Sequence, residues 1–202
     1  MVEINKEIEL KFAIENLPEL NNENIEIFKI VQDYIYKDEF STIRKRIMKN
    51  IINGECKYIY TVKTDGDIKD KHSVYEIETE ITEEKYNLIK SSNNIVEKYR
   101  IKIQIGNELV AELDIYYGHL EGLITVEVEF ENEEDLSKFE KPIWFGKELY
   151  KKQFSNAKLS RMTRDEFLNI VDKETIDKNM KFKQIVEEFI KSKNKGANQD
   201  EI

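Results

Sequence analysis

Pairs of like-charged residues, two positions apart, recur along the first 130 residues of this 202-residue chain. Three pairs are acidic and two are basic: Glu7 with Glu9, Arg44 with Arg46, Glu76 with Glu78, Lys98 with Arg100, and Glu127 with Glu129. On a strand, the two side chains of a pair would project from one face about 6.6–6.8 Å apart. Two carboxylates at that distance repel each other unless a cation lies between them, and two cations repel unless an anion does. The pairs therefore indicate a site that takes divalent cations and a polyanion together.

Phosphoryl transfer on a polyphosphate is a chemistry that uses both signs of charge. Arg and Lys side chains neutralise and orient phosphate oxygens. Carboxylates hold Mg²⁺ or Mn²⁺ through hard oxygen ligands, and the metal bridges to the phosphate and can activate a water. The alternative interpretation is an antiparallel sheet with one solvated face, but such faces normally intersperse the two signs of charge. The like-charged pairs instead favour a charged interior.

Alternation of charged and apolar residues with a period of two predicts the strands that carry these pairs. The alternating segments are 7–12, 42–48, 58–63, 75–81, 98–105, 112–115 and 125–130, and 31–36 is a further candidate strand. Asn53-Gly54, Asp65-Gly66 and Gly106-Asn107 predict hairpin turns between antiparallel strands. Seven or eight such strands can close into a barrel. The apolar faces are the ones that need covering, so the charged faces would lie inside.

Helical patterns are fewer than strand patterns. Thr82 and Asn132 are good N-cap residues for short helices. After Thr163 the apolar period changes to 3.6, which predicts one or two amphipathic helices. We expect the helix containing Phe182–Ile190 to pack against the barrel exterior, with closure of one barrel mouth or a dimer face as alternatives. The polar residues 194–202 are expected to form a disordered tail, so that residues 1–193 make a single domain.

In their order along the chain, these motifs resemble the signature of the CYTH domain, the triphosphate tunnel metalloenzymes. Glu7-x-Glu9-x-Lys11 resembles the ExExK motif of that family. The further matches are Arg44-x-Arg46, Lys63, Glu76-x-Glu78, Lys98-x-Arg100, Asp114 in Leu-Asp-Ile-Tyr-Tyr-Gly, Glu127-x-Glu129-Phe130, and residues 144–149 with 154–159, which resemble FGxEV…YxNxxL. The resemblance spans residues 3–160. It departs at Phe154, where Tyr is usual, at Val74, where a basic residue is common, and at 150–153, which lack a usual acidic residue.

The resemblance implies an α+β fold built on an eight-stranded antiparallel β-barrel, with flanking helices and a C-terminal helical segment. The interior of such a barrel binds a triphosphate and Mg²⁺ or Mn²⁺. By position, the implied metal ligands are Glu7, Glu9, Glu127 and Glu129, with Glu76, Glu78 and Asp114 as further candidates. The implied substrate-binding residues are Lys11, Arg44, Arg46, Lys63, Lys98 and Arg100. Lys11 would stabilise the reacting phosphoryl group, with Glu7 and Glu9 beside it as the other catalytic residues.

The activity that follows from the resemblance is divalent-metal-dependent hydrolysis of a triphosphate compound, most simply inorganic tripolyphosphate. A class IV-type adenylate cyclase, which makes cyclic AMP and pyrophosphate from ATP, would use the same residues. A thiamine triphosphatase would differ mainly at the rim of the tunnel. The non-enzymatic alternative is a module that binds polyphosphate or a nucleotide without turning it over.

The composition narrows the range of partners. The 41 acidic residues exceed the 32 Lys and Arg residues, which gives a net charge of -9 and argues against a nucleic-acid polymer on the surface and against an electrostatic membrane binder. Cys56 is the single cysteine, which excludes an intrachain disulfide and a cysteine zinc cluster. No segment approaches 18 apolar residues. We therefore expect a cytoplasmic protein, monomer or homodimer, with a small-molecule triphosphate as its substrate.

Overall fold

The computed structural model of the chain describes residues 5–20, 25–65, 73–106 and 109–197. The strands are β1 (Asn5–Ile14), β2 (Glu26–Lys37), β3 (Ser41–Asn50), β4 (Cys56–Asp65), β5 (Ser73–Ile81), β6 (Ile95–Ile105), β7 (Leu109–Tyr116), β8 (Ile124–Phe130) and β9 (Phe145–Glu148). The helices are α1 (Glu83–Leu88), α2 (Glu133–Lys138), α3 (Lys151–Phe154), α4 (Asn156–Leu159), α5 (Arg164–Leu168) and α6 (Lys173–Ala197), with a short 3-10 turn, η1 (Gly118–Leu120). The turn positions Gly66 and Asn107, the Val74 side chain and residues 198–202 lie outside the described part.

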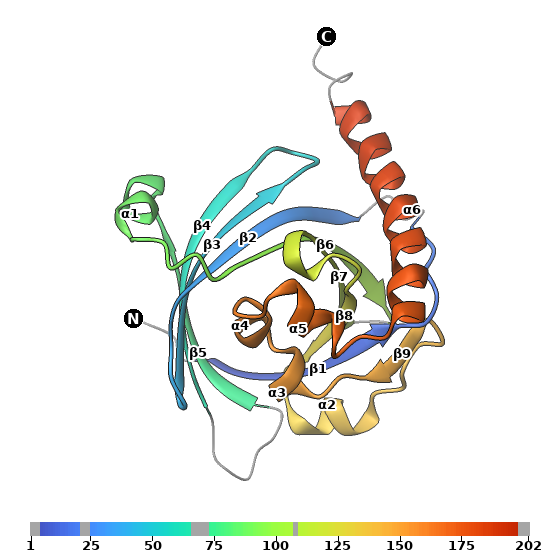
Figure 1. The fold of residues 1–202 in the computed structure, drawn as a ribbon, viewed down its shortest axis with the longest axis horizontal. Coiled ribbons are helices and arrows are strands. Elements are labelled where there is room, and N and C mark those ends of the chain that lie inside the picture. The colour runs from blue at the N-terminus through green and yellow to red at the C-terminus, as the bar shows by residue number, and fades with distance from the viewer. Residues whose placement is uncertain (1–4, 21–24, 66–72, 107–108, 198–202) are drawn as a thin grey trace.

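Eight of these strands form a closed antiparallel barrel (Figure 1). The hydrogen-bonded order is β5-β4-β3-β2-β6-β7-β8-β1, and β1 pairs back with β5 from Asn5 opposite Glu76 to Ile8 opposite Ser73. The short strand β9 pairs with β1 as well, through Phe12 and Ile14. The predicted α+β fold with an eight-stranded antiparallel barrel is therefore confirmed.

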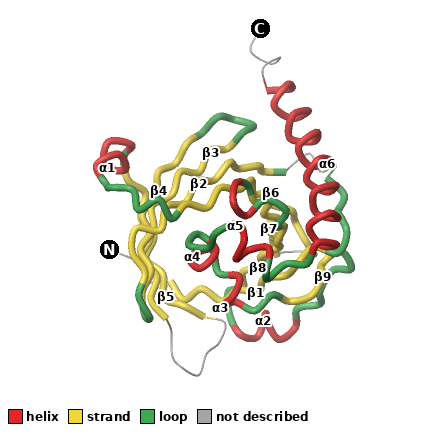
Figure 2. Tube along the Cα trace, in the orientation of Figure 1, coloured by secondary structure: helices red, strands yellow, loops and turns green. Residues whose placement is uncertain are grey.

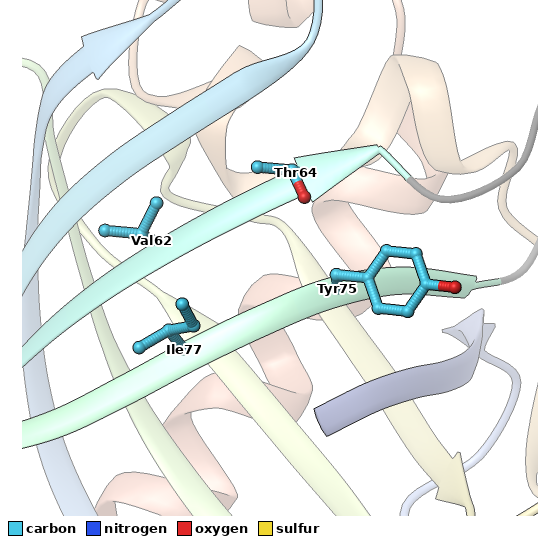
Figure 3. A pocket seen from close by; sticks show the side chains of 4 residues that line it. All are labelled: Val62, Thr64, Tyr75 and Ile77. Carbon is cyan, nitrogen blue, oxygen red and sulfur yellow. The ribbon is translucent and has the colours of Figure 1, made fainter. Parts of the chain in front are cut away.

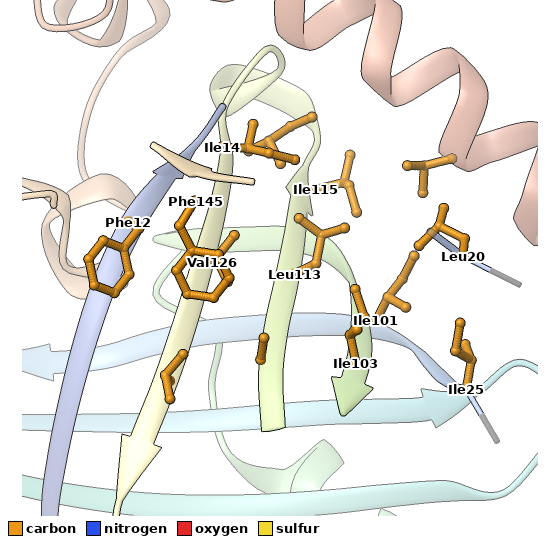
Figure 4. Packing of buried hydrophobic residues seen from close by; sticks show 14 of the residues in the cluster. Phe12, Ile14, Leu20, Ile25, Ile101, Ile103, Leu113, Ile115, Val126 and Phe145 are labelled. Carbon is orange, nitrogen blue, oxygen red and sulfur yellow. The ribbon is translucent and has the colours of Figure 1, made fainter. Parts of the chain in front are cut away.

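The apolar side of the alternation faces outward, where other elements cover it on β1, β6, β7 and β8 (Figure 4). Ile101, Leu113 and Val126 are fully buried in this outer cluster. Val186 and Ile190 of α6 belong to the same cluster. The prediction that the C-terminal helix packs against the barrel exterior is therefore confirmed.

The helix α6 docks on the barrel through a glycine at the β7–β8 connection. Gly122 has φ of +93°, and a Cβ atom there would lie 2.9 Å from Cγ2 of Ile176. The Asn179 side chain donates a hydrogen bond to the Gly122 carbonyl, at 2.9 Å. The helix continues through position 194 to Ala197, past the expected start of the tail. Among the described residues, no helix has the length and apolar character needed to cross a membrane.

A second apolar cluster fills one end of the barrel interior. Tyr34, Val96 and Tyr116 contribute to it from β2, β6 and β7. Their partners come from residues that follow β9: Leu149, Phe154, Ala157, Leu159, Phe167 and Val171. Figure 2 shows α3, α4 and α5 within the outline of the strands, while α6 lies outside it. The chain just before α6 thus fills this end of the barrel, whereas α6 contributes Val186 and Ile190 to the outer cluster.

The outer face of β4 and β5 carries a shallow apolar depression of about 370 Å³. Val62, Thr64, Tyr75 and Ile77 line it (Figure 3). Tyr75 remains 47% exposed there. Beside this depression, Tyr86 of α1 packs on the outer face of the barrel against Tyr58 of β4, with ring centroids 5.3 Å apart.

Two short helices begin at the residues that the sequence indicated. The Thr82 side chain accepts a hydrogen bond from the Lys85 amide at the start of α1. The Asn132 side chain accepts from the amides of Glu134 and Asp135 at the start of α2. Each cap pairs a backbone donor that the helix itself leaves unpaired, which is why these positions end the preceding strands.

Candidate active site

The antiparallel registers bring the predicted residues of different strands side by side in the barrel interior. Lys11 lies opposite Glu127, and Glu9 lies opposite Glu129. Arg100 lies opposite Asp114 on the neighbouring pair of strands. These residues alternate with the apolar ones of the outer cluster, so the charged faces point inward, as predicted.

On one side of the interior, β3, β4 and β5 place cations against carboxylates in a chain of shared ion pairs, in which each cation contacts one or two carboxylates. We call this set the β3–β5 wall: Arg44, Arg46, Lys63, Glu76 and Glu78. Arg44 Nη2 lies 3.1 Å from Glu76 Oε1, and Arg46 Nη2 lies 2.8 Å from Glu78 Oε2. Lys63 Nζ lies 3.0 Å from Glu76 Oε2 and also pairs with Glu7 of β1. The predicted ExExK and RxR motifs therefore meet around Lys63 and Glu76.

The two arginines of this wall retain donors that no side chain of the described residues accepts. The Nε atoms of Arg44 and Arg46 are both buried without a hydrogen-bond partner. Burial and the neighbouring Arg44 lower the pKa of Arg46 to about 10, although Glu78 opposes them. Unpaired buried donors and adjacent like charges are both unfavourable, and an anion between the two guanidinium groups would relieve both.

On the opposite side, β6, β7 and β8 form a more tightly connected set. We call it the β6–β8 wall: Lys98, Arg100, Glu112, Asp114 and Glu127. Arg100 donates from Nε to Asp114 Oδ1 at 2.8 Å and from Nη2 to Asp114 Oδ2 at 2.7 Å. It also pairs with Glu127 and Glu112, and Lys98 pairs with Asp114. The side chains of Lys98 and Asp114 are both 0% exposed.

This geometry makes Asp114 an anchor for two buried cations. Both of its carboxylate oxygens already accept hydrogen bonds from Lys98 or Arg100. Most of the Arg100 donors are likewise directed at carboxylates rather than at open space. The structure thus brings these three predicted residues together, but as a buried network and without an open coordination position on Asp114.

Glu112 belongs to the site although it was not among the predicted residues. It lies opposite Lys102 on β6 and opposite Glu127 on β8. Its carboxylate pairs with Arg100 and lies 3.8 Å from Lys102 Nζ. Glu112 and Asp114 are themselves a like-charged pair two positions apart, so the rule that selected the other pairs would have selected Glu112 too.

Carboxylates gather where β7, β8 and β1 adjoin. Burial, followed by the charges of Glu7, Glu112 and Glu9, raises the pKa of Glu129 to about 7. Oxygen donors that repel one another in this way are the chemistry that Mg²⁺ or Mn²⁺ prefers. Within the described ranges, however, no three acidic, histidine or cysteine side chains converge closely enough to hold a metal ion. The donor chemistry therefore fits a divalent cation, whereas the side-chain positions do not form a complete coordination sphere.

Lys11 lies between the acidic residues and the segment that fills one end of the barrel. Its Nζ lies 2.6 Å from Glu127 Oε1 and donates to the Phe154 carbonyl at 3.0 Å. Burial alone would lower the pKa of Lys11, but the carboxylates of Glu127 and Glu9 contribute to a net rise, so the ammonium stays charged. Because the contact to Phe154 uses the backbone, the absence of the usual Tyr hydroxyl at that position does not affect it.

No protein-family model matches the chain. The inorganic triphosphatase of Nitrosomonas europaea is 28% identical over 155 residues, which cover 76% of this chain and 96% of that protein. A solved structure of an inorganic triphosphatase shares 26% identity with a TM-score of 0.53, covering 80% of this chain and 97% of that one. A second solved structure, of a hypothetical protein, shares 27% identity with a TM-score of 0.53, covering 78% and 99%.

Proposed function

We propose, from a resemblance to the triphosphate tunnel metalloenzymes that these comparisons confirm, that the chain hydrolyses triphosphate compounds. Inorganic tripolyphosphate is the proposed substrate, and the reaction releases phosphate and pyrophosphate. The similarity to inorganic triphosphatases over three quarters of the chain supports the reaction class. The proposal includes dependence on Mg²⁺ or Mn²⁺, action in the cytoplasm, and a monomeric or homodimeric state.

The observation that carries the proposal is the pair of unpaired donors on the β3–β5 wall. The Nε–H groups of Arg44 and Arg46 are buried, adjacent and without acceptors among the described residues. Phosphate oxygens are the acceptors that guanidinium groups bind with the best geometry. Lys63, beside them, adds a third cation to the same side. These residues would hold the phosphate chain along one side of the interior.

The reacting phosphoryl group would lie next to Lys11. Of the three donors on its ammonium, one is directed at Glu127 and one at the Phe154 carbonyl, which leaves one for a phosphate oxygen. Lys11 would thereby stabilise the charge that develops on the transferring group during in-line attack by water. The buried ion pairs of the β6–β8 wall would keep Glu127, and through it Lys11, in place.

The proposed metal ligands are Glu7, Glu9, Glu127 and Glu129, with Glu76 and Glu78 as further candidates. When bound there, Mg²⁺ or Mn²⁺ would neutralise the phosphates and lower the pKa of an attacking water. Burial, followed by repulsion from Glu7, Glu112 and Glu9, raises the pKa of Glu129 to about 7, and a bound cation would relieve this repulsion. Asp114 is the weakest member of the predicted set, because Lys98 and Arg100 occupy its oxygens.

A substrate panel tests this function. The protein is incubated with tripolyphosphate, ATP or thiamine triphosphate in Mg²⁺ or Mn²⁺, and the products are separated. We expect phosphate and pyrophosphate from tripolyphosphate, with the highest kcat/KM of the three. Cyclic AMP with pyrophosphate would identify a cyclase instead, preferred turnover of thiamine triphosphate would identify that substrate, and tight metal-dependent binding without turnover would identify a binding module.

Two variants link the activity to the site. We expect Glu9→Ala and Lys11→Ala to reduce phosphate release to a small residual rate while circular dichroism shows an intact barrel. Lys138→Ala is the matched control, because that lysine lies on α2 with a 67% exposed side chain. Full activity in both site variants would refute the assignment.

A further inference from the structure

The segment that connects β9 to α4 contacts Lys11 at two points. The Leu149 amide donates to the Lys11 carbonyl at 2.8 Å, which fixes the backbone. The Lys11 ammonium donates to the Phe154 carbonyl at 3.0 Å, which orients the side chain. With Glu127 at 2.6 Å, two of its three donors have fixed directions, so the direction of the third depends on where the Phe154 carbonyl lies.

The position of that carbonyl is set two residues further along the chain. Asn156, the first residue of α4, accepts a hydrogen bond on Oδ1 from the Tyr116 hydroxyl, at 2.6 Å. Tyr116 is 0% exposed on β7, and its hydroxyl also lies 3.5 Å from Thr125 Oγ1 of β8. Asn156 thereby ties the loop between α3 and α4 to two rigid strands of the barrel.

We propose that Asn156 is a positioning residue for Lys11. Its hydrogen bond with Tyr116 fixes the Phe154 carbonyl, and this carbonyl aims the remaining donor of the Lys11 ammonium at the reacting phosphoryl group. The inference rests on the proposed function, since it assigns a role within the same site. Asn156 acts through Tyr116 and Phe154, and the substrate itself is held by Arg44, Arg46 and Lys63.

Because the substrate is held by residues other than the one that orients Lys11, we expect an Asn156 variant to change kcat more than KM. Removing the Asn156 amide leaves the cations of the β3–β5 wall unaltered, so ground-state binding of the substrate and KM should stay within about twofold. Misplacing a catalytic group by 1 Å can lower the rate by about 100-fold, so a loosened Lys11 should lower kcat by about tenfold.

The experiment is a set of coupled variants assayed for kcat and KM on tripolyphosphate. Asn156→Ala, Tyr116→Phe and the double variant should all lose the same factor, because each breaks the same hydrogen bond. In a Lys11→Ala background, Asn156→Ala should cause no further loss of the residual activity. Asn156→Asp retains an oxygen that accepts from Tyr116, so its kcat should return to within about threefold of the parent.

A second readout does not depend on activity. A buried, hydrogen-bonded lysine ammonium exchanges its protons slowly enough to be followed by ¹H–¹⁵N NMR, and Lys11→Ala assigns its signal. The signal should be sharp in the parent and in Asn156→Asp, and broadened in Asn156→Ala. Ser155→Ala is the control, since that side chain caps α4 by accepting from the Lys158 amide at 3.3 Å. It should lower thermal stability without moving kcat or the signal.

The outcomes separate this inference from the function on which it rests. A parent without triphosphatase activity, or a fully active Lys11→Ala, would overturn the proposed function. If the parent is active and Asn156→Ala keeps the parent's kcat, the positioning role alone is overturned. The same follows if Asn156→Ala lowers activity as much in the Lys11→Ala background as it does in the parent. An unchanged Lys11 signal in Asn156→Ala would overturn it as well, whatever the activity.

Discussion

The two sides of the barrel interior use the same residue types but connect them differently. On the β3–β5 wall, each cation faces one or two carboxylates, Glu78 is 40% exposed, and the Nε donors of both arginines stay unpaired. On the β6–β8 wall, Arg100 is directed at three carboxylates, and Lys98 and Asp114 are wholly buried. The availability of a cation to a ligand thus depends on how many of its donors are already engaged. Arginine-rich motifs alone do not reveal that difference.

The electrostatic consequences of the two arrangements also differ. Burial opposes ionisation of Glu127, but Lys11, Lys98 and Arg100 hold its pKa well below the usual range. On the same wall, burial and the neighbouring Arg100 lower the pKa of Lys98 to about 8, although Asp114 opposes them. On the β3–β5 wall, burial and Arg44 lower the pKa of Arg46 to about 10, which reflects like charges held together. Each wall thus holds a cation whose pKa is lowered, but among the described residues it is the β3–β5 wall that leaves buried guanidinium donors without acceptors.

The largest expected difference between the walls is in folding stability. Asp114→Asn leaves Lys98 and Arg100 buried without their main counter-ion, and breaking such a buried pair costs about 3–5 kcal/mol. Glu78→Gln removes a partly exposed partner, which should cost less than about 1 kcal/mol. Urea unfolding followed by circular dichroism measures both free energies. Equal losses would show that the two walls do not differ in the way described.

The next effect is on ligand affinity. Arg44→Ala should weaken binding of tripolyphosphate by about 10- to 100-fold, the worth of charge-assisted hydrogen bonds of about 1.5–3 kcal/mol. Isothermal titration calorimetry measures the Kd. Lys45→Ala is the matched control, because Lys45 is the next residue on the same strand but donates outward to the Ile89 carbonyl at 2.6 Å. A similar loss of affinity in both variants would contradict the inward placement of Arg44.

Features that depend on residues close together in the sequence could be predicted from it, whereas contacts between strands far apart in the sequence could not. The alternation of side chains between the two faces of a strand is a local pattern. The inward position of residues such as Glu9 and Arg44 could therefore be predicted without knowing which strands pair. The N-caps at Thr82 and Asn132 are equally local. Whether Arg100 meets one carboxylate or three depends on the registers of β6, β7 and β8, which no single segment encodes. That is why the engagement of Asp114 by Lys98 and Arg100 could not be predicted. Glu112, in contrast, could have been selected by the local spacing rule, because it precedes Asp114 by two positions.

The closed end of the barrel was hard to predict for a similar reason. Phe154 and Asn156 stand in short helices of four residues each, which carry too few turns to show a periodic apolar face. The long helix α6 has such a face, so the sequence indicated it more clearly than the short helices as a segment that could close a barrel mouth. The contact from Lys11 to the Phe154 carbonyl involves a backbone atom, for which side-chain patterns give no signal. The domain boundary at residue 193 stays a prediction.

The smallest expected effect concerns pH. The pKa of Glu129 is about 7 in the folded protein against a reference of 4.5, so the folded state binds more protons between these values. Its contribution to stability is therefore fully present below about pH 4.5 and is lost as the pH rises through about 7. Because the Glu129 side chain is exposed, solvent screening keeps the effect below about 1 kcal/mol.

Thermal unfolding between pH 5 and pH 8, without divalent cations, measures this contribution. Glu129→Gln should flatten the pH dependence of Tm, and Glu112→Gln should flatten it partly by lowering the pKa of Glu129. Mg²⁺ added at pH 8 should raise Tm of the parent more than that of Glu129→Gln. A parent and a Glu129→Gln variant with identical pH profiles would show that the cluster of carboxylates does not act as described.

The pairing of β1 has a consequence for how the protein is made. Besides its pairing with β5, the strand that carries Glu7, Glu9 and Lys11 pairs Ile8 with Phe130 and Phe12 with Glu148, so one of its edges is completed only when β8 and β9 have been made. Until then, an alternating strand of Ile, Leu and Phe is an unpaired edge on the nascent chain, open to contacts with other chains. Translation that stops before β8 is complete would release an aggregation-prone fragment that lacks the carboxylates opposite Lys11. Closure of the barrel around β1 thus requires the chain through β9.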